Sequence, residues 1–108
     1  MRISITERRC SVPKRVLERT ESLVGGLSKY EEQAAAADVV FSDEKHTKKV
    51  EIIVHIDGAP QVVARAEGDD FRPALDRTVD RAKRMLRDQR ERRRNHQAPP
   101  LSEVITEE

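Results

Sequence analysis

The sequence contains few of the features on which redox, secreted and membrane proteins depend. Cys10 is the single cysteine among 108 residues, so no internal disulfide can form, and we expect a reducing, cytoplasmic compartment. No run approaches the roughly 18 apolar residues of a membrane span, and the opening segment lacks the apolar stretch of a signal peptide. We therefore expect no association with a membrane.

Enzyme motifs are also missing. His46, His55 and His96 are scattered, without a second ligand at a helical or strand spacing, so no metal site is expected. The sequence has no glycine-rich phosphate loop, no G-x-S-x-G motif and no cysteine with a nearby base. Only 3% of the residues are aromatic and 36% are apolar, which predicts a small core without a large ligand pocket. We predict a non-enzymatic protein with no catalytic residues, no cofactor and no small-molecule substrate.

Charge, by contrast, is abundant and unevenly distributed. Charged residues make up 38% of the sequence and nearly cancel, to a net charge of +1. Residues 1–94 hold all 21 lysines and arginines, whereas three of the 20 acidic residues lie in 95–108. We predict one folded, basic domain over residues 1–94, followed by an acidic flexible tail over residues 95–108.

Alternation of apolar and polar residues predicts four strands. The first is "RISIT", with Ile3 and Ile5 on one face; strand character resumes from about Asp38, then in "KVEIIVHID" and in "QVVARAEG". The link "DGAP" (57–60) predicts a tight connection between antiparallel neighbours. The connection "DEKHTKK" (43–49) is longer and charged, and it is expected to be a mobile loop.

Two segments have the three- and four-residue spacing of amphipathic helices. The first begins near Pro13, and the glycine pair 25–26 is expected to stop or loosen it at Val24, because each glycine costs about 1 kcal/mol inside a helix. The second starts from an aspartate cap at 69–70, and its last two turns are expected to extend past the domain. Their apolar stripes are Val16, Leu17, Thr20, Leu23, Leu27 and Tyr30, and Phe71, Leu75, Val79, Ala82 and Leu86.

The predicted fold is α+β, in the order β-α-β-β-β-α. The simplest packing places both apolar helix stripes on one face of a four-stranded sheet and leaves the other face in water. The polar strand residues expected on the open face are Ser4, Glu51, His55, Arg65 and Glu67.

The outward faces of the two helices are predicted to be rich in basic residues, because these lie opposite or beside the apolar stripes at about 100° per residue. Acids stand at ion-pair spacing from several of them, so a merely solvated helix surface is the plain alternative. The basic residues expected to face outward are Lys14, Arg15, Arg19 and Lys29, and Arg77, Arg81, Lys83, Arg84 and Arg87.

Two features favour nucleic acid over the plain alternative. Arginine exceeds lysine in the second helix, and its planar fork suits phosphate. Concentration of positive charge on one element is also typical of nucleic-acid binders. The open sheet face has no aromatics for stacking bases, which favours backbone recognition of folded RNA over single strands. A DNA-associated regulator stays open, as does a protein-interaction module whose basic helix docks on an acidic partner or on its own tail.

Several strings, taken in order, resemble the ribosome hibernation promoting factors and ribosome-associated translation inhibitors, a family also called sigma-54 modulation proteins. The matching pieces are "RISIT", "VVFSDEK", "VEIIVHI", "VVARAEGDDF" and "ALDRTVDRAKRML", within about residues 1–90. Arg81 and Arg84 fall on two basic positions of that family's last helix, and Asp76 and Asp80 fall on its acidic positions. Asp88, where relatives often have lysine, is a departure.

The resemblance implies a fold similar to a double-stranded RNA-binding domain and a function in translation regulation. Such a protein binds the small ribosomal subunit and its rRNA near the decoding region, and it inhibits translation under stress or in stationary phase. The chain looks like a short form, without the domain by which long forms pair ribosomes, and we expect a monomer in isolation. Asp76 and Asp80 are expected to orient the arginines. The expected RNA-binding residues are Arg77, Arg81, Arg84, Arg87, Arg15, Arg19 and Lys29.

Overall fold

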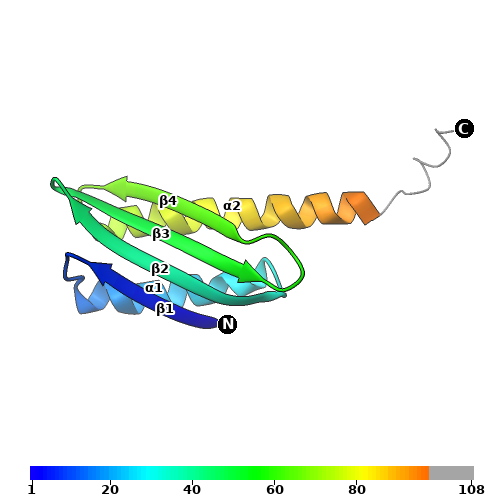
Figure 1. Ribbon diagram of the computed structural model, residues 1–108, viewed down its shortest axis with the longest axis horizontal. Coiled ribbons are helices and arrows are strands. Elements are labelled where there is room, and N and C mark those ends of the chain that lie inside the picture. Colours follow the sequence, from blue (N-terminus) through cyan, green and yellow to red (C-terminus); the bar gives the residue numbers. More distant parts are fainter. Residues whose placement is uncertain (98–108) are drawn as a thin grey trace, which may run out of the picture.

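The computed structural model describes residues 1–97, with side chains placed through Arg94. One sheet carries both helices on the same face (Figure 1). In chain order the elements are β1 (Arg2–Arg8), α1 (Lys14–Gly25), the 3-10 helix η1 (Gly26–Lys29), β2 (Ala34–Glu44), β3 (Thr47–Ile56), β4 (Val62–Gly68) and α2 (Phe71–Gln97). The predicted α+β order β-α-β-β-β-α is confirmed.

The sheet has the strand order β1-β2-β3-β4. β1 pairs parallel to β2 after the crossover through α1. β2, β3 and β4 form an antiparallel meander, which includes the predicted antiparallel pair joined by residues 57–60. One row of paired residues, Ile5, Val39, Ile52 and Ala64, crosses the whole sheet. Because Val39, Ile52 and Ala64 are buried beneath the helices, this register places every second residue of the strands in the core.

The core lies between the sheet and the two helix stripes. Leu75 and Leu86 of α2 are fully buried, and Phe71 packs edge-on against Phe41 of β2, with ring centroids 5.5 Å apart. The opposite sheet face carries the predicted polar residues, beside the half-buried Val40, Ile53 and Val63. Its expected residues Ser4, Arg65 and Glu67 are exposed, and Glu51 and His55 are half-buried.

The glycine pair changes the geometry of the first helix without ending its apolar stripe. α1 ends at Gly25, one residue beyond the predicted point, and the chain continues as the 3-10 helix η1. This shorter turn still buries Leu27 completely. The segment therefore loosens at the glycines, as the sequence predicts, while it keeps its contact with the core.

The predicted mobile loop over residues 43–49 is wrong. β2 and β3 stay paired up to Glu44 and Thr47, which leaves only Lys45 and His46 in the turn. Both turn residues have positive φ, 49° and 66°, the backbone conformation of the tightest hairpins. The charges that suggested a loop instead pair across the strands, because Lys48 donates to Asp43 and Lys49 donates to Glu44 at 2.9 Å.

β2 also begins earlier than the predicted position near Asp38. Ala34 opposes Ile56 of β3, and Ala36 opposes Arg2 of β1. Alanine is a poor strand former, but here pairing on both sides and burial of Ala34 and Ala37 outweigh that preference.

α2 extends beyond the sheet, as predicted (Figure 1). Its helical backbone includes residues 95–97, which the sequence analysis assigned to the acidic tail. The remainder of that tail, residues 98–108, lies outside the described residues. The far end of α2 is tied to the domain by Arg93, whose guanidinium donates to the buried carboxylate of Glu31.

Candidate nucleic-acid interface

α1 and α2 are joined by an ion pair across their outer surface. Arg19 donates to both carboxylate oxygens of Asp76, from Nε at 2.9 Å and from Nη2 at 3.1 Å. This hydrogen bonding raises the pKa of Arg19 above its ordinary value. Asp76 therefore orients an arginine, but one from α1, whereas Asp80 pairs with no side chain that the structure describes. The pair joins two helices that already pack on the same core.

A cleft of about 600 Å³ opens between the first turns of the two helices. Arg15 and Arg19 of α1 line it, together with Arg72 of α2 and Lys48 of β3. The Lys48 ammonium lies 5.4 Å from the centre of the Phe71 ring, which holds it at the cleft wall. Asp70 is the carboxylate among the lining residues, while Arg19 and Lys48 pair with Asp76 and Asp43 outside the lining. Arg15 and Arg72 therefore give the cleft a modest positive charge.

Sequence reasoning missed Lys48 and Arg72. Lys48 was assigned to a loop, and its place at the cleft depends on the register of the β2–β3 hairpin. Arg72 lies in the first turn of α2, at a helix end where unpaired amide groups favour anions. Neither first helical turn contains an acidic residue, which strengthens that preference.

Arg77 and Arg81 lie on the flank of α2 that faces β4. The Arg77 guanidinium donates to the carbonyl of Glu67 at 2.7 Å, and Arg81 donates to the carbonyl of Arg65. Each guanidinium has five N–H groups, so these bonds orient it and leave donors for a ligand. A Cβ at Gly68 would come within 3.0 Å of Arg77 Nη1, so the absent side chain leaves room for this arrangement.

The other basic residues of α2 occupy its remaining exposed sides. Lys83 and Arg87 lie over the ring of Tyr30, at 5.9 and 5.7 Å from its centre. The side chain of Arg84 is exposed and forms no hydrogen bond or ion pair with another side chain of the described chain. Lys29 is exposed at the end of η1. All seven predicted contact residues therefore reach solvent, in separate groups. Arg81 extends past β4 and also lines a pocket with Glu51, Arg65 and Glu67 of the open sheet face.

The open sheet face is neutralised by its own pairs. His55 lies 2.9 Å from Asp38, and Arg65 donates to Glu51 at 2.7 Å. The three aromatic residues are Tyr30, Phe41 and Phe71, and all three pack in or against the core beneath the helices. Bases therefore have no stacking platform on the open face, and the charged surface for a polyanion is the helical one.

A membrane-spanning helix and a cluster of metal-ligating side chains are both absent from the part of the chain that the structure describes. No helix over residues 1–97 is long and apolar enough to cross a membrane. Within the same residues, no group of three or more potential metal-ligating side chains comes together.

Comparison with known proteins matches residues 3–94 to the family described as sigma 54 modulation protein / S30EA ribosomal protein. A ribosome hibernation promoting factor of Azotobacter vinelandii is 28% identical over 86 residues, covering 80% of this chain and 79% of that protein. Among solved structures, a ribosomal subunit interface protein from Coxiella burnetii has a TM-score of 0.78 at 21% identity, covering 84% of this chain and 99% of its own. The N-terminal domain of Protein Y from Thermus thermophilus has a TM-score of 0.72 at 26% identity, covering 82% and 98%.

Proposed function

The chain belongs to the sigma 54 modulation protein / S30EA ribosomal protein family, and from this premise we propose that it is a ribosome hibernation factor. It binds the small ribosomal subunit near the decoding region through rRNA, and it inhibits translation under stress or in stationary phase, in the cytoplasm. The names of its relatives support association with the ribosome. The resemblance in the sequence motifs led to the same family.

One observation supports this proposal above the others: Arg15 and Arg19 of α1 and Arg72 of α2 line one cleft, and the Arg19–Asp76 pair joins the two helices beside it. A fixed array of guanidinium groups matches the regular phosphates of a folded RNA backbone better than separate flexible charges do. The proposed contacts are Arg15, Arg19, Lys29, Arg77, Arg81, Arg84 and Arg87, with Lys48 and Arg72 added by the cleft.

In this mechanism no base is read. Phosphate contacts give affinity and fix the orientation of the bound protein, while sequence information would require contacts to base edges. The protein inhibits by occupancy, because a domain seated at the decoding region excludes the ligands of that site. No covalent chemistry is needed.

The proposal is tested by reversing charge on the helical surface. The variant Arg81→Glu with Arg84→Glu should be lost from the small-subunit fraction of a sucrose gradient, whereas the unaltered protein should sediment with that fraction. A matched control, Arg2→Glu with Lys45→Glu, makes the same charge change at two exposed positions that line neither the cleft nor the pocket beside Arg81. The control should still bind.

Circular dichroism establishes that both variants are folded. Unaltered co-sedimentation of the folded Arg81 and Arg84 variant would remove these residues from the mechanism. Equal affinity of the unaltered protein for duplex DNA and for ribosomal RNA would instead favour a DNA-associated regulator.

A further inference from the structure

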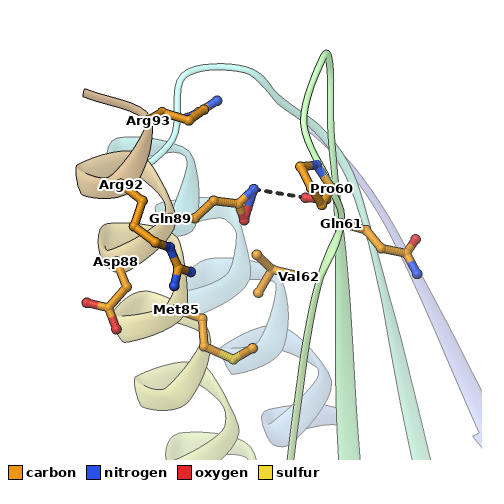
Figure 2. A pocket seen from close by; sticks show the side chains of 8 residues that line it. All are labelled: Pro60, Gln61, Val62, Met85, Asp88, Gln89, Arg92 and Arg93. Carbon is orange, nitrogen blue, oxygen red and sulfur yellow. Dashed lines mark hydrogen bonds between the residues drawn. The ribbon is translucent and has the colours of Figure 1, made fainter. Parts of the chain in front are cut away.

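A hollow of about 680 Å³ lies between the β3–β4 turn and the last turns of α2 (Figure 2). Pro60, Val62 and Met85 supply its apolar walls, and Gln89 bridges its top by donating to the carbonyl of Pro60 at 3.0 Å. Met85 remains 38% exposed there, and within residues 1–94 the other exposed large apolar side chain is Met1. The hollow is therefore an apolar surface without a described partner, on the β4 side of α2.

We propose that this hollow binds the C-terminal segment of the same chain, residues 98–108, through the apolar side chains of Leu101, Val104 and Ile105. The segment follows directly after Gln97 at the end of α2, so it is tethered next to the hollow at a high effective concentration. An intramolecular occupant of this kind needs only a modest apolar contact, because the entropy of association is already reduced.

The C-terminal segment is long enough to reach back from the end of α2 to the hollow. α2 rises about 18 Å between Met85 and Gln97, and residues 98–105 span up to about 26 Å when extended. Pro99 and Pro100 lack the amide that would continue the helix, and a residue before proline disfavours the helical conformation. The sequence is therefore suited to leaving the helix direction at this point.

Charge supports the same occupant. Arg92 lines the hollow and is exposed, whereas Arg93 is already paired with Glu31, and Asp88 is the acid at the rim. The exposed Arg90 lies on the same turns, where Arg94 pairs with Glu91 at 3.8 Å. The segment contributes three glutamates and no basic residue, so its charge complements these turns. Its glutamates are Glu103, Glu107 and Glu108.

The methyl group of Met85 reports on the hollow directly. The chain has two methionines, so protein labelled at methionine methyls gives two NMR signals, and Met85→Leu assigns them. Removal of residues 98–108 should shift the Met85 signal and leave that of Met1 in place. Replacing Leu101, Val104 and Ile105 by serine in the full chain should reproduce the truncated position.

Ser102→Ala is the matched control, because it alters the segment and leaves its apolar residues intact; its spectrum should match that of the unaltered chain. Identical Met85 signals in the full and truncated chains would overturn the proposal. A shift that disappears on dilution would also overturn it, since the occupant would then be a second copy. None of these measurements involves RNA, so they do not depend on the proposed function.

Discussion

At the scale of single residues, exposure was predictable and partners were not. Helical periodicity alone places Arg77 and Arg81 away from the core stripe, and both are exposed. Two main-chain carbonyl groups of β4 orient their guanidinium groups. A sequence pattern does not show which main-chain carbonyl a side chain will reach. The Arg19–Asp76 pair joins residues far apart in the chain, so it follows only once the packing of the helices is known.

A substitution at Gly68 measures how tightly the Arg77 side chain is confined. Gly68→Ala should give a smaller gain in unfolding free energy than Gly26→Ala, because the new methyl group meets Arg77 Nη1 at 3.0 Å, whereas Gly26 has no neighbour within 4 Å. A glycine replaced by alanine without a clash in a helix gains about 0.5–1 kcal/mol. Urea denaturation of both variants measures the difference, and equal gains would show that Arg77 is not confined by this contact.

At the scale of elements, the type and order of the helices and strands were predicted well from the sequence. The bounds of the strands and the turn between β2 and β3 were predicted poorly. Alternation identified every strand because one sheet face is buried and the other is wet. The turn at Lys45 and His46 was missed because neither glycine nor asparagine, the usual residues at positive φ, occupies it. The start of β2 was missed because alanine has little strand preference, and only pairing with β1 and β3 reveals it.

The hairpin turn can be improved. Lys45→Asn with His46→Gly should stabilise the protein by about 1 kcal/mol, since the new residues tolerate positive φ that costs the present ones energy. For a domain of this size such a gain raises the Tm by roughly 4–8 °C. Calorimetry measures the change. His46→Ala retains the unfavourable φ and should give no gain, and a similar rise in that control would locate the benefit elsewhere.

At the scale of the whole molecule, the fold and the polarity of its two faces followed from the sequence because local patterns agreed with one another. The cationic cleft could not be predicted from the sequence, because its lining residues come from three separate elements. These residues are Arg15 and Arg19 of α1, Lys48 of β3 and Arg72 of α2. Its position depends on the hairpin register and on the helix packing together. Such a site becomes visible only in three dimensions.

The cleft makes a quantitative prediction about salt. If Arg72 contacts a phosphate, Arg72→Gln should reduce the slope of log affinity against log salt by about 0.7–0.9, the contribution of one neutralised phosphate. Filter binding to small subunits at several salt concentrations measures this slope. Arg2→Gln on β1 removes the same charge from the far side and should leave the slope unchanged. A slope unaffected by Arg72→Gln would place the phosphate contacts outside the cleft.

The two arginines on the β4 flank have a second consequence. β4 is the last strand of the sheet, and the carbonyls of Arg65 and Glu67 would otherwise be available to hydrogen-bond a strand from another molecule. Arg77 and Arg81 occupy these acceptors and place positive charge along the border. Their guanidinium groups thus obstruct the addition of a further strand at this edge, and the edge is covered by the same side chains that are proposed to hold RNA.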